Sequence, residues 1–225
     1  MITPRFPYQK LSRETLEGSR KYALPDGQRV SSVTTIIEAT KSEESKQALN
    51  NWRKRVGVQK AQQITTEAAS RGTRMHKWLE NYVCDDAMGE PGSNPYSQQS
   101  HKMASGIVEN FLTPNVTEIY GTEVSLYYPG LYAGTTDCVA NWQGEVSILD
   151  FKQTNKPKKT EWVQDYFLQL CAYALAHNEV YGTNISQGVI LMCSQEYELQ
   201  HWVIAGAEFE AYTQKWIQRV DEFYR

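Results

Sequence analysis

The sequence is poor in the features that mark several large classes of protein. It has 4 cysteines, with no Cys-x-x-Cys pair and no histidine at zinc-finger spacing, which argues against a structural zinc site, an iron–sulfur cluster or a disulfide scaffold. No apolar run approaches the roughly 18 residues of a membrane span, and the first residues lack the apolar stretch of a secretory signal. With only 14 Gly and 8 Pro in 225 residues, the chain is neither collagen-like nor of low complexity. We therefore expect a soluble, globular, intracellular protein.

A strong excess of charge is also absent. The chain has 23 Lys and Arg against 26 Asp and Glu, a net charge of −3, which taken alone argues against a nucleic-acid partner. The basic residues are clustered, however. Residues 51–80 hold seven Lys or Arg and two acids, a local charge of +5, and residues 150–160 hold four Lys and one Asp, a local charge of +3.

The pattern of apolar residues predicts helices in the first half of the chain and a strand-rich second half. We expect a single mixed α/β or α+β domain over residues 1–225, with a helical block at 44–112. The expected elements are extended segments within 20–37 around Pro25-Asp26-Gly27, helices at 44–63, 64–83 and 99–112, a loop at 85–98, strands at 117–128, 131–142 and 145–154, a helix at 161–181, strands at 188–195 and 197–206, and a helix at 208–223.

Three charged residues on the expected strands are the strongest candidates for chemistry. Asp150 and Lys152 are two residues apart, so they lie on one face of a strand while Phe151 faces the other way. A short turn at 141–145 would place Asp137 on the neighbouring strand. Two carboxylates and an ammonium would then meet, and carboxylates of this kind suit Mg²⁺ or Mn²⁺.

An Asp-x-Lys triplet is a weak signal by itself. Glu44-Ser45-Lys46 has the same spacing in a polar stretch, and most such triplets are surface ion pairs of little energetic consequence. Asp150 differs because Ile148, Leu149 and Phe151 make its strand apolar, which leaves its charge poorly solvated.

The order of several weak motifs is more specific than any one of them. Gly134-x-x-Asp137, Asp150-Phe151-Lys152, Gln169-x-x-x-Tyr173 and, upstream, Gly72-x-x-x-His76 resemble the motif series of RecB-like exonucleases in the PD-(D/E)XK superfamily. The segments SVTTII and DFKQTNKPKKTEWVQDYFLQLCAYA resemble most closely the mitochondrial genome maintenance exonucleases and their phage homologues. The resemblance covers about residues 20–205. It implies a restriction-endonuclease-like core, a central mixed β-sheet flanked by helices, with the block at 44–112 arching over the active site.

The resemblance also implies roles for individual residues. His76, Asp137, Asp150 and the backbone carbonyl of Phe151 would bind Mg²⁺ or Mn²⁺, with Glu80 as a weaker candidate one turn beyond His76. Lys152 would position or activate the attacking water and offset charge on the scissile phosphate. Gln169 and Tyr173 share a helix face and would assist there. Taken singly, His76, Gln169 and Tyr173 are more often structural residues.

The resemblance implies DNA as the substrate, most consistently single-stranded DNA with free ends, and a monomeric, cytoplasmic enzyme of a bacterium or a phage-infected cell. Two alternatives are a duplex-resecting exonuclease of the phage lambda type, which works 5′ to 3′ as a ring oligomer, and a catalytically silent DNA-binding or recombination module. Of the aromatic residues Trp52, Trp78, Tyr132 and Trp162, one or two could stack on bases. The expected DNA contacts come from the two basic segments and are Arg53, Lys54, Arg55, Arg71, Arg74, Lys77, Thr154, Lys156, Lys158 and Lys159.

Overall fold

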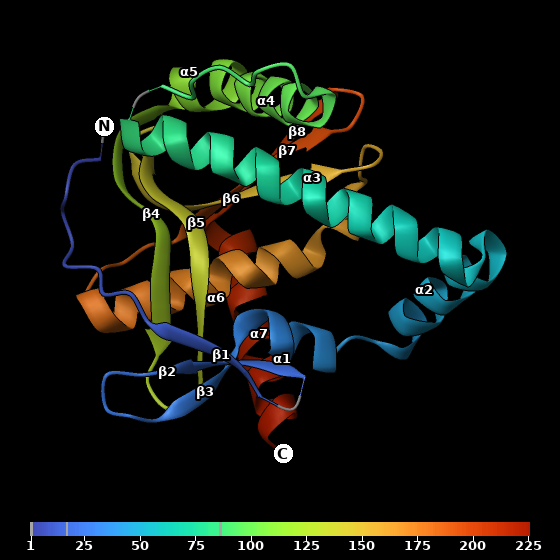
Figure 1. Cartoon of the computed structure of the whole chain (residues 1–225). Coiled ribbons are helices and arrows are strands. Elements are labelled where there is room, and N and C mark those ends of the chain that lie inside the picture. The colour runs from blue at the N-terminus through green and yellow to red at the C-terminus, as the bar shows by residue number, and fades with distance from the viewer. Residues whose placement is uncertain (1, 17, 86) are drawn as a thin grey trace.

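Among the residues that the structure describes, eight strands form a mixed β-sheet at the centre of the molecule (Figure 1). The structure is a computed structural model, and it describes residues 2–16, 18–85 and 87–225. The strand order is β1-β2-β3-β5-β6-β7-β8, and β4 pairs with the other edge of β5. The strands are β1 (Ser12–Leu16), β2 (Ser19–Ala23), β3 (Arg29–Ser32), β4 (Val116–Tyr128), β5 (Tyr132–Trp142), β6 (Glu145–Thr154), β7 (Gln187–Ser194) and β8 (Leu199–Ala205).

Helices cover both faces of this sheet. On one face α1 (Val33–Ala39), α6 (Gln164–Tyr181) and α7 (Gly206–Tyr224) pack over one apolar cluster, and on the other α3 (Val58–Asp85) and α4 (Pro95–Ile107) pack over a second. The remaining helical segments are α2 (Glu43–Val56), a π-helical turn at Val108–Leu112, α5 (Thr113–Asn115) and a 3-10 turn at Thr160–Trp162. The expected central mixed sheet flanked by helices is confirmed.

The alternation along β6 shows how the sequence sorts side chains between the two layers. Ile148 is buried in the cluster beneath α6, whereas Leu149 and Phe151 are buried in the cluster beneath α3. Because successive side chains point to opposite faces, Asp150 and Lys152 lie on the α6 side. The β5–β6 hairpin expected from the short turn is present, with Cys138 opposite Leu149 and Trp142 opposite Glu145.

One predicted extended segment is wrong in its second half. Residues Val33–Ile37 were expected to be a strand because of their β-branched side chains, but they form α1. The Ser32 side chain caps this helix by accepting a hydrogen bond from the Thr35 amide at 3.0 Å. Val33, Ile36 and Ile37 then fall on one helical face and are all buried, so tertiary packing overrides the strand propensity.

The helical block differs from the expectation in its boundaries. Gly57, with φ of 90°, separates α2 from α3, where we expected one continuous helix, and α4 begins at Pro95, capped by Asn94. The expected surface loop at 85–98 is therefore shorter, and its residue 86 lies outside the described residues. Strand β1 was not expected.

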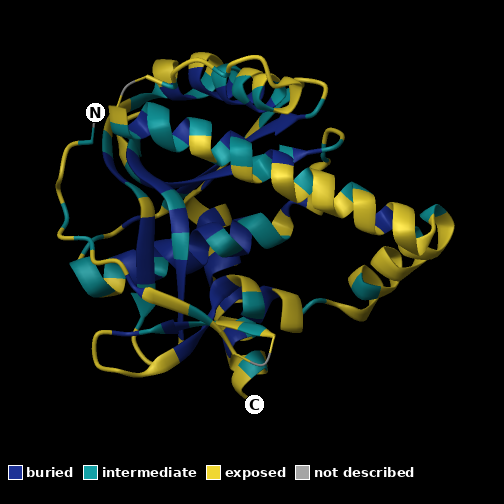
Figure 2. Ribbon diagram, in the orientation of Figure 1, coloured by how far each residue is buried: buried dark blue, intermediate teal, exposed yellow. Residues whose placement is uncertain are grey.

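The first half of α3 and all of α2 project from the body as an arm (Figure 2). Helix α2 has no buried residue, whereas α3 buries Ala61 and Arg71 in its first half and Met75, Leu79 and Val83 in its second half. Among the residues that the structure describes, no helix is both long enough and apolar enough to cross a membrane.

Candidate active site

The sheet forks at the position of the predicted catalytic residues. Strand β3 pairs with β5 only through Tyr132 and Ala133, and β6 pairs with the same edge of β5 only from Cys138 onward. Within the described residues, the stretch 134–137 of β5 is therefore without a strand on that edge. From Asp150 onward β6 follows β7 instead, with Asp150 opposite Ile190. Asp137 of β5 and Asp150 of β6 thus lie where these two strands diverge, beyond the pairing of Cys138 with Leu149, and we call this position the fork. Side-chain contacts connect the two strands there in place of backbone pairing.

Both carboxylate oxygens of Asp137 contact neighbouring elements at the fork. Oδ2 accepts a hydrogen bond from the Phe151 amide at 2.6 Å, and Oδ1 lies 3.4 Å from Nδ1 of His76, which α3 carries across the sheet. Burial would raise the pKa of Asp137, but His76, Lys152 and the Phe151 amide outweigh it and hold that pKa below its ordinary value. Burial lowers the pKa of His76, and the Asp137 carboxylate more than compensates, so this pKa is raised.

Asp150 and Lys152 form a buried ion pair on the α6 side. Asp150 is 1% exposed, and its Oδ2 contacts the Lys152 ammonium. Burial raises the pKa of Asp150, whereas the ammonium opposes that rise. Burial would lower the pKa of Lys152, but the carboxylates of Asp150 and Asp137 outweigh it and raise that pKa. Lys152 therefore stays protonated at neutral pH. The pKa of Asp150 is raised while that of Asp137 is lowered, so the two carboxyl groups differ in their affinity for a proton.

Helix α6 holds the ammonium from the other side. The Lys152 Nζ atom donates to Oε1 of Gln169 at 3.5 Å and lies 4.8 Å from the ring centre of Tyr166. Nε2 of Gln169 in turn donates to the Tyr173 hydroxyl at 3.2 Å. Tyr173 is buried, and its ring packs directly on Gly134 of β5. The structure thus brings Gln169 to Lys152 and places Tyr173 in the core behind it.

The structure adds a residue that the sequence interpretation missed. Glu123 of β4, His76 and Asp137 each offer one ligand atom, and these three atoms lie within 4.8 Å of one another. The pairing of Thr122 with Cys138 and of Val124 with Thr136 puts Glu123 directly across from Asp137. Counting residues along the β4–β5 hairpin from Asp137 would have found Glu123, but without the observed register its carboxylate was one exposed acid among many.

The other predicted ligands lie outside this compact set. Glu80 is one turn from His76, but its carboxylate binds the Lys77 ammonium at 3.0 Å. The Phe151 ring is buried and lies edge-on to the His76 ring, with 6.3 Å between ring centres. Carboxylate oxygens and an imidazole nitrogen are a donor set that fits Mg²⁺ or Mn²⁺.

Two of the predicted DNA contacts, Arg71 and Thr154, are buried. Arg71 is buried, and its guanidinium donates to Gln153 at 3.0 Å, to Gln195 at 3.2 Å and to Asn155. Thr154 is also buried, and its hydroxyl donates to the Lys156 carbonyl at 2.7 Å. Both side chains serve the contact between α3 and the end of β6, so neither is free to meet a phosphate.

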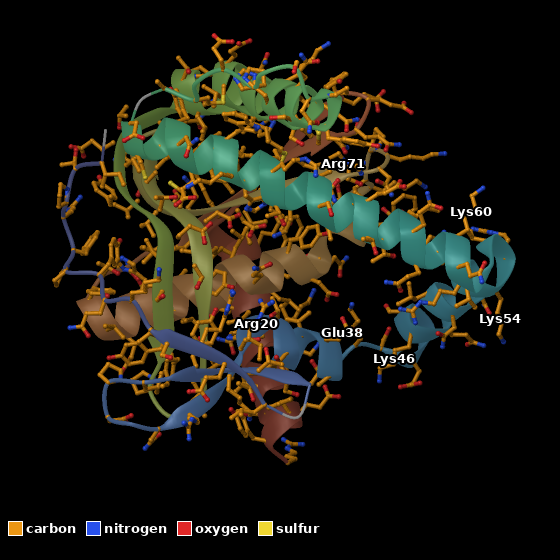
Figure 3. All side chains as sticks on the ribbon, viewed as in Figure 1. Arg20, Glu38, Lys46, Lys54, Lys60 and Arg71 are labelled. Atoms are coloured by element: carbon orange, nitrogen blue, oxygen red, sulfur yellow. The ribbon has the colours of Figure 1, made fainter. Side chains whose placement is uncertain are left out.

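The remaining basic residues lie in two places. Arg53, Lys54 and Arg55 are exposed at the end of α2, and Figure 3 places Lys54 and Lys60 at the far end of the arm. Arg74 lies against Ser100 and the Tyr96 ring, and Lys77 is paired with Glu80. Lys156 and Lys158 line a hollow of about 340 Å³ together with Trp162 and Tyr166, and Lys159 lies over the Trp162 ring.

The four aromatic residues considered for stacking on bases differ in their exposure. Trp162 is 58% exposed and remains available to a base, whereas Tyr132 is 2% exposed and donates its hydroxyl to the Ala172 carbonyl at 3.1 Å. Trp52 and Trp78 are half-buried, Trp78 against His101. Tyr132 is therefore a core residue.

The order of the motifs, and the way they meet at the fork, relate this chain to the PD-(D/E)XK-like exonucleases. Sequence comparison agrees: the chain is 26% identical to human mitochondrial genome maintenance exonuclease 1 over 207 residues, which is 86% of this chain and 58% of the human protein. The mouse and Xenopus tropicalis proteins of the same name are 25% and 26% identical. The relationship inferred from the motifs is confirmed. The chain spans 57–59% of the length of these relatives.

Other comparisons are weaker. No family model matches the chain. Among solved structures, a candidate exonuclease from Eubacterium rectale has a TM-score of 0.48 at 14% identity, over 69% of this chain and 64% of that one. An alkaline exonuclease from Laribacter hongkongensis has a TM-score of 0.29 at 12% identity, over 71% of this chain and 94% of that one. Both scores are too low to add to the sequence relationship.

Proposed function

We propose that this protein is a Mg²⁺- or Mn²⁺-dependent exonuclease that hydrolyses phosphodiester bonds of DNA, preferentially single-stranded DNA with free ends. The fork carries the proposal, because it gathers Asp137, Asp150 and a protonated Lys152 from two strands that share no backbone pairing there. The names of the related proteins, all exonucleases, support the same activity.

Each residue has a task in this proposal. His76, Asp137, Asp150 and the Phe151 carbonyl would hold the cation, with Glu80 at the periphery. When bound, such a cation polarises the phosphate and lowers the pKa of water. Lys152 keeps its proton because two carboxylates surround it, so it would orient the water and neutralise charge on the phosphate rather than take up the proton. The water oxygen would form a bond to phosphorus and give up a proton to solvent, while the bond to the 3′ oxygen breaks and that oxygen takes up a proton from solvent, so that a 5′-phosphate and a 3′-hydroxyl remain.

The preference for single strands depends on the arm. In Figure 1, α2 and the first half of α3 extend outward beside the sheet, and a loop joins α2 to α1. Basic residues on α2, and Trp162 near the end of β6, could guide a backbone and stack a base. We propose that this helical block arches over the active site of a single nuclease domain and that a free end threads through it as the monomer works.

End-labelled linear single strands, circular single strands and duplexes, each with Mg²⁺, Mn²⁺ or chelator, test the activity. We expect linear single strands to be degraded only with a metal and circles to survive. Equal digestion of circles would contradict threading, and preferred duplex digestion by a ring oligomer on a sizing column would favour the lambda-type alternative.

Variants of the ion pair test the roles. Asp150→Asn and Lys152→Met should each lower cleavage at least a hundredfold while DNA binding remains. Lys215→Ala, an exposed change of the same charge on α7, is the matched control. Full activity in Lys152→Met would refute the assigned role, and metal-independent DNA binding without cleavage by the unaltered protein would favour a silent module.

A further inference from the structure

Glu123 occupies an unfavourable position for an acid that has no ligand. It lies directly across from Asp137 on the paired strands β4 and β5. Their carboxylates are close enough to share one small ligand, since their oxygens and a His76 nitrogen all fall within 4.8 Å. Like charges directly opposite each other in an antiparallel pair destabilise the sheet.

The positive groups that act on Glu123 are His76, which also serves Asp137, and more weakly Arg13. The ammonium of Lys152 is engaged by Asp150, and that of Lys77 by Glu80. Among the ion pairs of the described residues, none includes Glu123. A positive charge from outside the chain would relieve the repulsion between Glu123 and Asp137.

The backbone at Glu123 agrees with a position that is retained for its side chain. Its φ is 50°, in the left-handed region that a residue with a side chain seldom adopts in a strand. Strain of this kind persists where the surroundings impose it, and it is frequent at ligand sites.

A small ion has a route to this position. An open cavity of about 1240 Å³ lies between the N-terminal segment and β4, and both Glu123 and Glu80 line it. Glu123 is exposed, whereas Asp150 is deeply buried. A cation at the fork would therefore be reached from solvent through the Glu123 side.

We propose that Glu123 is a further ligand of the divalent cation at the fork, which it would bind together with His76 and Asp137. This inference rests on the proposed metal-dependent function. It assigns the outer, solvent-facing side of the metal site to a residue of β4, outside the strands that carry Asp137 and Asp150. Asp150 and Lys152 would then form the inner side, toward α6.

Mn²⁺ binding to the full chain, measured by calorimetry after chelator treatment and dialysis, tests the inference without an activity assay. Glu123→Gln should bind Mn²⁺ at least tenfold more weakly than the unaltered protein. Its melting temperature without metal should equal or exceed that of the unaltered protein, because the repulsion with Asp137 is gone. Glu145→Gln, which removes an exposed acid from the β5–β6 turn, should change neither quantity.

The outcomes separate this inference from the proposed function. If the unaltered protein binds Mn²⁺ and Glu123→Gln binds it within twofold, the role of Glu123 is refuted and the metal-dependent function stands. If the unaltered protein binds no Mn²⁺, both are refuted. Glu123→Ala repeats the binding test with a different side chain.

Discussion

The contact between Gly134 and Tyr173 leads to the most specific prediction, the effect of adding one methyl group at Gly134. A Cβ atom at this position would lie 2.6 Å from Cε1 and 2.8 Å from the hydroxyl oxygen of Tyr173. Both distances are shorter than real Cβ contacts. Gly134 lies within β5, where any residue could adopt the backbone conformation, so the requirement for glycine is one of space.

The magnitude follows from how little the ring can move. Tyr173 is 2% exposed, and the Gln169 amide holds its hydroxyl at 3.2 Å. Adding a methyl group to such a packed site costs about 1–3 kcal/mol. For a protein of this size that corresponds to a fall in melting temperature of about 2–4 °C per kcal/mol. A shift of the ring would also disturb Gln169 and, through it, Lys152, so turnover should fall along with stability.

Urea unfolding of Gly134→Ala, of Tyr173→Leu and of the double variant measures the contact as a cycle. Tyr173→Leu leaves room for the methyl group, so the double variant should be about 1–2 kcal/mol more stable than the sum of the single changes predicts. Gly106→Ala, in α4, is the control. Its Cβ atom would lie 3.4 Å from the Leu199 side chain, an ordinary contact distance, so the change should stabilise the helix by about 0.5–1 kcal/mol. Unchanged stability of Gly134→Ala, or strict additivity in the cycle, would refute the reasoning.

Two further predictions concern buried polar groups away from the reaction. Arg71→Met should lower the free energy of unfolding in urea by about 2–4 kcal/mol, because three amide oxygens lose their donor, and Arg71→Lys should restore less than half of that loss. Burial lowers the pKa of His177 from 6.5 to about 4. Between these two pH values the unfolded chain binds a proton at His177 that the folded chain does not bind. The free energy of unfolding should therefore fall by about 3 kcal/mol as the pH falls from 6.5 to about 4. Melting curves across this range should show a shallower acid dependence for His177→Gln, and an unchanged slope would contradict the assignment.

The parts of the fold that sequence could predict are those with a local cause. Alternating apolar side chains and a short turn suffice for the β5–β6 hairpin, and the spacing of two residues places Asp150 and Lys152 on one face. Residues 33–37 show the opposite case. Their side chains favour a strand, and only the cap at Ser32 and burial against the sheet make them a helix.

The site was predictable to the extent that it lies on that hairpin. Glu123 was missed because its position opposite Asp137 depends on the register of β4 against β5, which is regular from the Tyr128–Tyr132 pair to the Thr122–Cys138 pair. The burial of Arg71 could not be predicted for a related reason. A basic residue in a positive segment suggests phosphate binding, but amide side chains from β6 and the turn after β7 bury this one.

The contacts at the fork explain why motifs that are weak singly have meaning as a series. Gly134 admits the ring of Tyr173, whose hydroxyl binds Gln169, and Gln169 binds Lys152. Lys152 pairs with Asp150, and the next amide along the strand binds Asp137, three residues from Gly134 on β5. The series is therefore a closed ring of contacts through two strands and one helix. Each member fixes the position of the ammonium or of a carboxylate. A change at Gly134 or Tyr173, which touch no substrate in the proposed reaction, therefore reaches the Lys152 ammonium through at most three contacts.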